Sequence, residues 1–287
     1  MPELPEVETI ARGLDRLVTG DAFESVWIGS RKQPLKSSAT LIASTLENKR
    51  ILRVHRAGKH IVFDLEGTAR PNKGRRGVRG KTRRAASPQT AQWIVHLGMT
   101  GRLVICEPMA EVAKHTHLIA KLASGRELRF IDPRMFGKLS VHAGCFDPGG
   151  VEPLEVREEA FLALFRGRKT PIKSALLNQK LLRGVGNIYA DESLFRAGIR
   201  PRRRAATITR EQLRNLHLAV GEVLREAIAL GGSSISDYVD ADGREGFFQL
   251  QHRVYGREGE PCLVCGSAIR RVVLSGRSSH FCAKCQK

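Results

Sequence analysis

Apolar residues near the start of the chain recur at the spacing of an α-helix. Proline at position 5 suits the first turn of a helix, and the acidic residues Glu6 and Glu8 suit the positive end of the helix dipole. We therefore predict a helix that begins a few residues into the chain and holds Pro2 and Glu3 in a fixed relation to the fold. The apolar positions on its buried face are Val7, Ile10, Leu14 and Leu17.

Between residues 25 and 131 the pattern changes to short apolar runs that are typical of β-strands. Many short strands at this spacing favour a sandwich or a barrel. Residues 68–90 interrupt two of the runs, and their Gly, Pro, Arg and Lys content cannot build a core, so we predict a flexible basic loop there. The predicted strands are SVWI, RILRV, HIVFDL, QWIVHL, RLVIC and, around a turn at Ser124 and Gly125, HLIAKL and ELRFI.

After FDPGGVEPLE the pattern becomes helical. The last and longest helix begins at a capping box formed by Thr209 and Gln212 and ends at Gly231 and Gly232. The chain is therefore predicted to be an α+β multidomain protein. The boundaries place an N-terminal β-rich domain at 1–148, a helical domain at 149–255 and a small third unit at 256–287.

Charge indicates the class of partner. The 287 residues include 48 Lys and Arg against 29 Asp and Glu, a formal net charge of +19. No acid lies between Gly67 and Ala91, yet the rest of the chain remains basic without that run. We expect a polyanion as partner, with a merely solvated basic surface as the alternative. Neither a membrane span nor a secretory signal is indicated.

The last residues carry four of the six cysteines in the pattern C-x2-C-x16-C-x2-C. Two close pairs separated by enough chain for a hairpin are typical of a tetrahedral zinc site. Four protein ligands leave no position for water, so we expect one structural zinc ion, held in a reducing, cytoplasmic compartment. The ligands are Cys262, Cys265, Cys282 and Cys285.

Two further segments suit contact with DNA. Gly276 and Arg277 fall at the expected hairpin tip, where an Arg can be inserted against nucleic acid or can simply be a solvated turn residue. In GVGNIYADE, Asn187 is predicted to cap the helix that follows, and the free N–H groups at that helix start suit a phosphate. The alternative for the second segment is an ordinary helix hairpin with glycine turns.

The residues PELPE at the start of the chain suggest a nucleophile with a nearby proton donor. Removal of Met1 would leave Pro2 with a secondary amine, which titrates near 8, well below a lysine. Such an amine can attack a sugar C1′ and form an iminium ion, and Glu3 can supply a proton. The alternative is a proline-rich helix entry with surface acids.

Several motifs occur together and in order, and with them the chain resembles the formamidopyrimidine-DNA glycosylase family, bacterial base-excision enzymes for oxidised purines. The resemblance covers the whole chain except residues 68–90. The motifs are PELPEVET, HLGMTGRL, IDPRMFG, PIKSALL, GVGNIYADE, GG-x-x-x-x-DY and the four-cysteine segment ending in CQK.

The resemblance implies a β-sandwich flanked by helices, then a helix-two-turn-helix domain with a zinc finger, acting as a monomer on duplex DNA near the bacterial nucleoid. The damaged nucleotide is flipped out of the stack. Pro2 is then the Schiff-base nucleophile and Glu3 the proton donor, with β- and δ-elimination after base removal. Glu6 lies near the flipped base, and Ser233, Ser234 and Tyr238 belong to the loop that covers it.

Other roles follow from the same resemblance. Met99, Arg134 and Phe136 fill the hole and face the orphaned cytosine. Lys173 is expected near the active site. The family's phosphate clamp matches Lys59, His96, Asn187 and Arg277.

Some features depart from the pattern or leave alternatives open. Met135 stands where a second basic residue is common in the family, and the basic insertion has no counterpart there. His115 and His117 form an HxH pair, for which we predict a packing or polar role. Two rival functions remain: an enzyme resembling endonuclease VIII that removes oxidised pyrimidines, and a catalytically silent DNA-damage-binding protein.

Overall fold

The computed structural model describes residues 1–31, 33–66, 91–234 and 246–287. The predicted loop at 68–90 and Tyr238 lie outside these residues. The chain forms two compact units: one contains residues 1–10, 57–59 and 148–287, and the other contains residues 11–56 and 60–147. The first ten residues therefore group with the helical part of the chain and not with the strands that follow them.

The second unit is built on an eight-stranded sheet in the order β5-β7-β6-β1-β2-β3-β4-β8. Neighbouring strands with a described register are antiparallel. Helix α2 (Ala39–Leu46) begins at Ser38, whose side chain accepts a hydrogen bond from the Leu41 N–H. The strands are β1 (Ala22–Ile28), β2 (Lys49–Ala57), β3 (His60–Leu65), β4 (Ala91–His96), β5 (Arg102–Cys106), β6 (Thr116–Leu122), β7 (Glu127–Ile131) and β8 (Lys138–Ala143).

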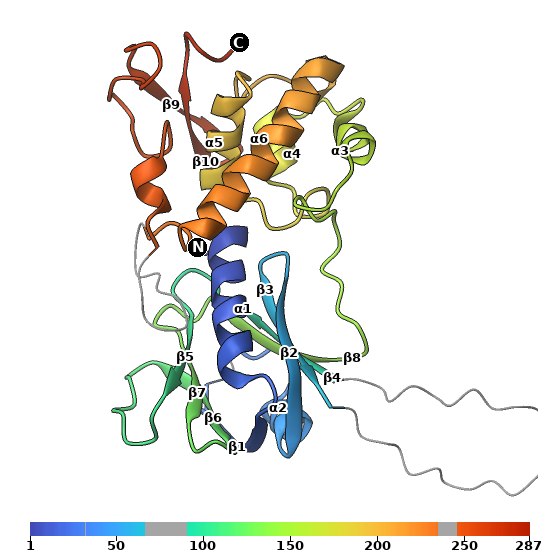
Figure 1. Ribbon diagram of the computed structural model, residues 1–287, viewed down its shortest axis with the longest axis vertical. Helices are drawn as coiled ribbons and strands as arrows, with labels where there is room; N and C mark the ends of the chain where they lie inside the picture. Colours follow the sequence, from blue (N-terminus) through green and yellow to red (C-terminus); the bar gives the residue numbers. More distant parts are fainter. Residues whose placement is uncertain (32, 67–90, 235–245) are drawn as a thin grey trace, which may run out of the picture. The chain divides into compact units, whose positions relative to one another are not determined.

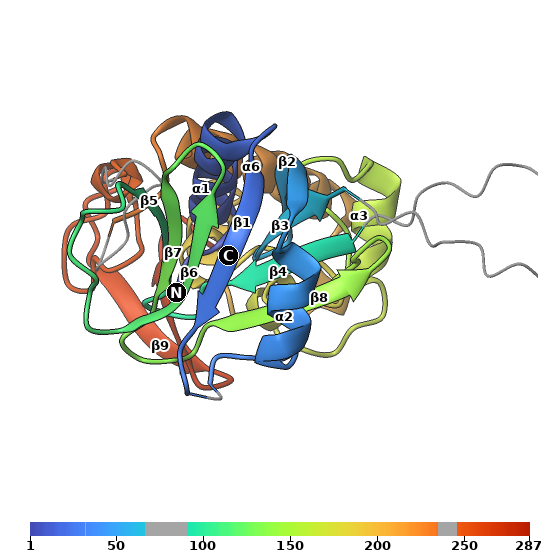
Figure 2. The same cartoon turned by 90° about the horizontal axis from the view of Figure 1, so that it is seen from below.

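The sheet bends so that its two halves share one core. Phe23 on β1 and Trp93 on β4 are three strand positions apart, which in a flat sheet would separate them by about 14 Å. Their ring centroids lie 6.0 Å apart, and both side chains are fully buried. In Figure 2, β7, β6 and β1 run across the direction of β4 and β8. The predicted sandwich-type fold is therefore confirmed.

Every strand predicted from the sequence is present, with ends that differ by at most a few residues. Strand β8 and helix α2 were not predicted. In β8, Leu139 is fully buried while Lys138 and His142 are exposed. The strand was missed because its polar residues leave no apolar run in the sequence.

The predicted first helix is α1 (Leu4–Val18), with Val7, Ile10 and Leu14 buried as expected. Leu17 is only half-buried, and Val18 is fully buried in its place. Residues up to Ile10 belong to the first unit and the later ones to the second.

The first unit contains the helices α3 (Glu158–Phe165), α4 (Ile172–Leu176), α5 (Asn187–Arg196) and α6 (Arg210–Ala229), and the short 3-10 turns η1 (Ala205–Thr207) and η2 (Phe248–Gln251). Helix α6 begins at the predicted capping box of Thr209 and Gln212. The fully buried core residues of this unit include Leu4, Phe161, Tyr189 and Leu216. Figure 1 shows α5 and α6 side by side, with the hairpin of β9 (Ile269–Leu274) and β10 (Arg277–Cys282) next to α5.

The four-cysteine hairpin is joined to the helices by the last residues of the chain. The Gln286 side chain accepts a hydrogen bond from the Cys282 N–H at 2.8 Å and donates to the Ile199 carbonyl at 2.8 Å. Arg200 donates to the carbonyls of Gln286 and Ala283, each at 2.8 Å. Phe195 of α5 packs in a small apolar cluster with Val254 and Ile269.

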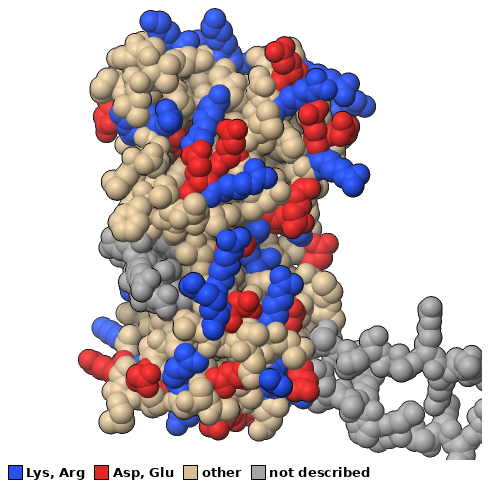
Figure 3. All heavy atoms as spheres, viewed as in Figure 1, with Lys and Arg blue, Asp and Glu red and all other residues tan. Residues whose placement is uncertain are grey.

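Charged side chains of both signs are interspersed on the face seen in Figure 3, with Lys and Arg more numerous. No helix among the described residues is long and apolar enough to cross a membrane.

Candidate active site

Two glycines of GVGNIYADE make room for the start of the chain. The Leu4 N–H donates to the Gly184 carbonyl at 3.0 Å, and a Cβ at Gly184 would lie 2.8 Å from the Leu4 side chain. A Cβ at Gly186 would lie 2.2 Å from the carboxyl carbon of Glu3. The segment that begins with Pro2 is therefore fixed against the loop before α5.

The Glu3 carboxyl group is buried, with 4% of the residue exposed. Its Oε1 accepts a hydrogen bond from the Ile188 N–H at 3.2 Å, within the first turn of α5. Burial raises the pKa of Glu3 to about 7, the charge of Lys59 opposes that rise, and Glu6 adds to it. A carboxyl group with this pKa carries a proton on about half of the molecules at neutral pH, as a general acid requires.

Glu6 ties the first turn of α1 to the loop after α6. Its carboxylate accepts from the Glu3 N–H at 2.7 Å, the Ser233 N–H at 2.8 Å and the Tyr189 hydroxyl. Burial raises the pKa of Glu6, while these donors hold it down. Ser234, the next residue of the loop, donates its N–H to the Gln249 side chain at 2.9 Å.

Lys59 lies at the tip of the β2–β3 hairpin, next to Gly58, which has a φ of 60°. It is largely buried, and burial lowers the pKa of its ammonium group. Glu3 and Glu6 raise that pKa and Arg277 lowers it, so all three groups act electrostatically on Lys59. The structure thus brings the predicted residues Glu3, Glu6, Lys59 and Arg277 into one site.

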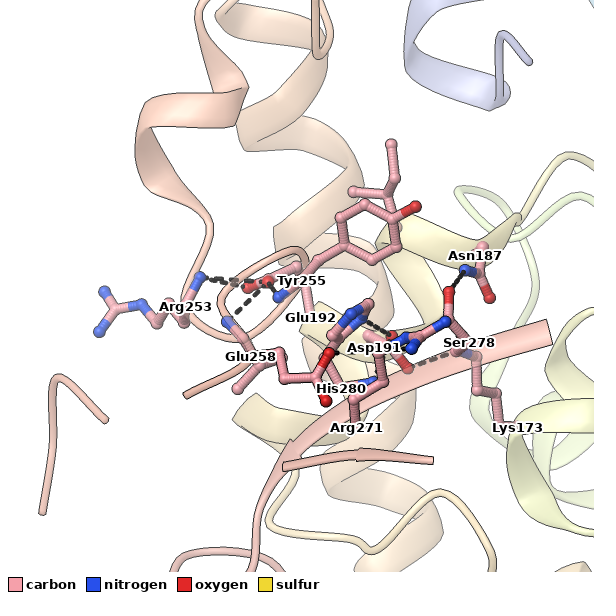
Figure 4. A network of polar contacts seen from close by, with 12 residues as sticks. Lys173, Asn187, Asp191, Glu192, Arg253, Tyr255, Glu258, Arg271, Ser278 and His280 are labelled. Atoms are coloured by element: carbon pink, nitrogen blue, oxygen red, sulfur yellow. Dashed lines mark hydrogen bonds and ion pairs between the residues drawn. The ribbon is translucent and has the colours of Figure 1, made fainter. Parts of the chain in front are cut away.

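Lys173 takes part in a buried ion pair shown in Figure 4. Its Nζ lies 2.7 Å from Asp191 Oδ1 and donates to the Ser278 carbonyl at 2.6 Å. The other Asp191 oxygen accepts from the His280 N–H at 2.9 Å. Burial lowers the pKa of Lys173, whereas Asp191 raises it. Asp191 therefore links α4, α5 and β10, next to Arg277.

The predicted role of Asn187 as a helix cap is wrong. Gly186, with a φ of −129°, is the N-cap of α5, and Asn187 is the first helical residue. Its Nδ2 instead donates to Ser278 Oγ at 3.4 Å. The helix start was also predicted to be free for a phosphate, but the Ile188 N–H donates to Glu3. The position of Glu3 accounts for the occupied helix start, and Ser278 binds the Asn187 side chain.

Arg277 is exposed, at the first position of β10. Ser275 and Gly276, with φ of 50° and 76°, form the two-residue turn of the hairpin, a conformation that matches the twist of the strands. The predicted hairpin tip is therefore present, and Arg277 next to the turn presents a cation to solvent.

Glu192 was missed by the sequence analysis. Its fully buried carboxylate accepts hydrogen bonds from three consecutive N–H groups, those of Arg253, Val254 and Tyr255, at 2.8–3.1 Å. Figure 4 shows the carboxylate pointing into this loop. Burial raises the pKa of Glu192 and the three donors oppose the rise. The only sign of this role in the sequence is that two acidic residues, Asp191 and Glu192, stand side by side in GVGNIYADE.

In the second unit, Asp132 organises the loops that carry Met99, Arg134 and Phe136. Its carboxylate accepts from Thr100 Oγ1 at 2.7 Å and from the N–H groups of Arg134 at 3.3 Å and Gly137 at 2.7 Å. Met99 and Phe136 are 40% and 51% exposed, and the Arg134 guanidinium lies 5.0 Å from the centre of the Phe136 ring. An exposed apolar pair beside a cation suits insertion into DNA.

Histidines of the second unit have polar contacts. His96 Nδ1 accepts from the Gly98 N–H at 3.1 Å, and its ring lies 5.0 Å from that of His60. His117 is buried and its Nε2 lies 2.9 Å from the Asp132 carbonyl, in agreement with the predicted polar role. Met135, between Arg134 and Phe136, receives a hydrogen bond on sulfur from Arg31 at 3.5 Å.

The four cysteines meet as predicted. Their sulfur atoms all lie within 4.8 Å of one another, and among the described residues they form the one cluster of side chains suited to a metal. Cys262 and Cys285 sulfurs are 3.9 Å apart, and those of Cys265 and Cys282 are 3.4 Å apart. A tetrahedral zinc with bonds of about 2.3 Å needs sulfur atoms about 3.8 Å apart, so the residues fit a structural metal.

Family models match along most of the chain. The N-terminal domain of formamidopyrimidine-DNA glycosylase matches residues 1–139, the H2TH domain of the same family matches 150–239, and the zinc finger found in FPG and IleRS matches 259–287. The chain belongs to the formamidopyrimidine-DNA glycosylase family. The resemblance identified from the motifs is confirmed.

Relatives match over their whole length. Formamidopyrimidine-DNA glycosylase of Solibacter usitatus is 45% identical over all of both chains. The crystal structure of the MutM (Fpg) protein of Thermus thermophilus has a TM-score of 0.82 and 39% identity, covering 99% of this chain and 98% of that one. A Lactococcus lactis Fpg mutant in complex with DNA containing Fapy-dG has a TM-score of 0.85 and 30% identity, over all of both chains.

Proposed function

We propose that this protein is a bifunctional DNA glycosylase and abasic-site lyase that excises oxidised purines, such as 8-oxoguanine and formamidopyrimidines, from duplex DNA in base excision repair. The observation that carries the proposal is the position of Glu3. This carboxyl group directly follows Pro2, is buried, and has a pKa of about 7. It can donate a proton beside a nucleophilic amine at neutral pH.

The reaction uses the amine that Pro2 has once Met1 is removed. The Pro2 nitrogen attacks C1′ of the flipped nucleotide and the glycosidic bond breaks; its electron pair leaves with the base, which takes up the proton that the amine nitrogen loses. Glu3 gives its proton to the sugar ring oxygen as the ring opens and the iminium forms. The iminium withdraws electrons, so a proton leaves C2′ and the 3′ phosphate departs by β-elimination; loss of a proton from C4′ then expels the 5′ phosphate by δ-elimination.

The roles proposed for the neighbouring side chains follow from their contacts. Lys59 and Arg277 supply positive charge for the phosphates that flank the lesion, together with Asn187 and His96. Lys173 positions the Arg277 strand through Ser278. Glu6 connects the reacting end of α1 to Ser233 in the loop proposed to cover the flipped base, to which Ser234 and Tyr238 also belong. Met99, Arg134 and Phe136 fill the space left by the base.

The metal proposed for the four cysteines is one zinc ion with a structural role. Zinc would supply the cross-link that keeps the β9–β10 hairpin and Arg277 in place. The same proposal includes a monomer that works on chromosomal DNA in the bacterial cytoplasm. Support for the compartment comes from the cysteines, all six of which are without disulfides.

Borohydride trapping tests the proposal. The purified protein, with loss of Met1 confirmed by mass spectrometry, is mixed with a duplex holding one 8-oxoguanine opposite cytosine, and the adduct is mapped. We expect a reduced cross-link at Pro2. The matched control is protein that retains Met1, in which the Pro2 nitrogen is an amide and cannot attack.

Two results would overturn the proposal in different ways. Tight binding without any adduct would establish a silent DNA-damage-binding protein. An adduct that forms faster with thymine glycol than with 8-oxoguanine would establish an oxidised-pyrimidine enzyme that resembles endonuclease VIII.

A further inference from the structure

A small cavity in the second unit lies outside the residues assigned so far to the reaction. Its volume is about 170 Å³, and it lies where β1 ends and β6 begins. Pockets for whole small-molecule ligands are usually about 300–1,000 Å³, so this one can enclose only part of a nucleotide, and the rest would lie on the exposed surface around it. It is lined by Trp27, Gly29, Ser30, Arg31, Lys114, His115, Thr116 and His117.

Trp27 is turned outward by an irregularity in its own strand. In a regular strand, Phe23 and Trp27 would point to the same face, because side chains alternate. The pairing of β1 with β6 shifts register between Phe23 and Ser25. As a result Phe23 is fully buried while Trp27 is 53% exposed. An extra residue of this kind commonly re-aims a side chain towards a functional surface.

The neighbours of Trp27 leave its ring accessible and surround it with positive charge. Trp27 is 53% exposed, and Gly29, whose Cβ would lie 3.5 Å from the outer edge of the indole, adds no side chain at that edge. Arg31 and Lys114 line the same cavity and are exposed. None of the described lining residues is acidic.

The cavity is connected to the loop that carries Arg134 and Phe136. Arg31 donates to the sulfur of Met135, which stands between those two residues. His117, at the base of the cavity, contacts the carbonyl of Asp132, the residue that holds the loop together. A nucleic acid that reaches Phe136 therefore lies close to the cavity as well.

We propose that this cavity binds one unpaired nucleotide, with the base stacked on Trp27 and the phosphate held by Arg31 and Lys114. An aromatic ring beside cations is the arrangement by which proteins bind single-stranded nucleic acid without sequence preference. A base inside an intact duplex has no free face for the indole, so the occupant is single-stranded DNA or a frayed end. The inference rests on the proposed DNA-binding function and is independent of the chemistry at Pro2.

Tryptophan fluorescence tests the site directly. The chain has two tryptophans, and the other one, Trp93, is fully buried in the core. We expect a single-stranded thymidine oligonucleotide to quench Trp27, and a relaxed circular plasmid, which has no ends, to leave its emission unchanged. No quenching by the bound oligonucleotide, or equal quenching by both DNAs, would overturn the proposal.

Variants supply a second readout. Trp27→Ala is expected to weaken binding of the oligonucleotide by roughly 5- to 150-fold, the range measured for loss of one stacked base. Lys114→Gln should make the salt dependence of that binding less steep by about 0.7, since the variant neutralises one phosphate fewer. The matched control is Lys121→Gln, an exposed lysine on β6, the strand that follows Lys114, but outside the cavity.

Borohydride trapping on an 8-oxoguanine duplex separates this proposal from the glycosylase mechanism. Trp27→Ala should form the Pro2 cross-link as the unaltered protein does. If the cross-link fails in both proteins while Trp27 is still quenched, the mechanism is wrong and the nucleotide site stands. If Trp27→Ala binds the oligonucleotide as tightly as the unaltered protein, the site is wrong whatever the outcome at Pro2.

Discussion

Gly186 lies so close to Glu3 that a methyl group on its Cα would overlap the carboxyl carbon, at 2.2 Å. The glycine of GVGN is required by this approach and not by its backbone, since a φ of −129° is open to any residue. The loop before α5 therefore packs closely against Glu3 and leaves no room for a side chain at position 186.

Gly186→Ala is expected to displace Glu3 and to lower the rate of Schiff-base trapping by about 100-fold, as misplacement of a catalytic group by about 1 Å can do. The free energy of unfolding should fall by about 1–3 kcal/mol from overpacking. The control is Gly221→Ala in α6, where the new methyl group would meet only the end of the flexible Arg225 side chain. That variant should trap normally; equal losses in both would contradict the role of Glu3.

The pKa of Glu3, about 7, sets a pH dependence for activity. Above pH 7 protonated Glu3 becomes scarcer, but the neutral Pro2 amine, which titrates near 8, becomes more abundant. If Glu3 donates a proton, the single-turnover rate of base removal should therefore decline only above about pH 8, approaching a tenfold loss for each further pH unit. Glu3→Gln should be much slower and should lack this decline. A wild-type rate that does not fall between about pH 8 and pH 10 would exclude Glu3 as the donor.

The same pKa has a consequence for stability. The folded protein keeps a proton on Glu3 that the unfolded chain loses near pH 4.5, so stability falls as pH rises from 4.5 to about 7. Glu3→Gln has no such proton. The unfolding free energy of Glu3→Gln, relative to that of the unaltered protein, should therefore increase across this window by at most about 3 kcal/mol. Above the window the difference should stay constant. Urea unfolding at several pH values measures the difference.

Loss of the metal should affect the hairpin that carries Arg277. Cys265→Ser is expected to reduce bound zinc from one ion per chain to a weakly held fraction, to lower the melting temperature and to weaken DNA binding. Metal analysis, thermal unfolding and DNA titration check these effects. Cys145→Ser is the control, because Cys145 is exposed and outside the cluster. Full DNA affinity in metal-free protein would show that the hairpin needs no metal.

The buried pair of Lys173 and Asp191 should be costly to break on one side. Asp191→Asn leaves the ammonium group buried without its charge partner, and the unfolding free energy should drop by about 3–5 kcal/mol. Replacing both partners, as Lys173→Met with Asp191→Leu, should recover part of that loss. If the double variant is as unstable as Asp191→Asn, hydrogen bonds to β10 and not the charge pair hold this region.

The basic insertion should act through its charge. Replacing residues 70–84 by an uncharged Gly/Ser segment of equal length is expected to make log affinity for undamaged duplex DNA fall less steeply with log salt, by about 0.9 for each phosphate that the insertion neutralises. Trapping on an 8-oxoguanine duplex should continue. An unchanged salt dependence would show that the insertion does not contact DNA.

Much of the fold follows from local rules that the sequence displays. The capping box of Thr209 and Gln212, the short apolar run HIVFDL and the spacing of the cysteines each depend on residues close in sequence, and the structure has them where they were predicted. The resemblance in motifs supplied the roles at the start of the chain, which spacing alone left open.

What could not be predicted depends on residues far apart. Asn187 is a good capping residue by type, but Ser278, 91 positions later, binds its side chain. Glu192 looks like a solvated acid until residues 253–255 present three N–H groups to it. The outward turn of Trp27 results from one extra residue in the pairing with β6, which no alternation pattern reveals.

The bonds of Gln286 limit how the four-cysteine hairpin can be exchanged between relatives. Its side chain joins Cys282 to the carbonyl of Ile199, and Asp191 binds His280 from the same helical region. A hybrid that receives a foreign hairpin without the matching α5 would leave these buried polar groups without partners. The junction of such a hybrid should therefore lie before α5, so that α5 and the hairpin come from the same relative.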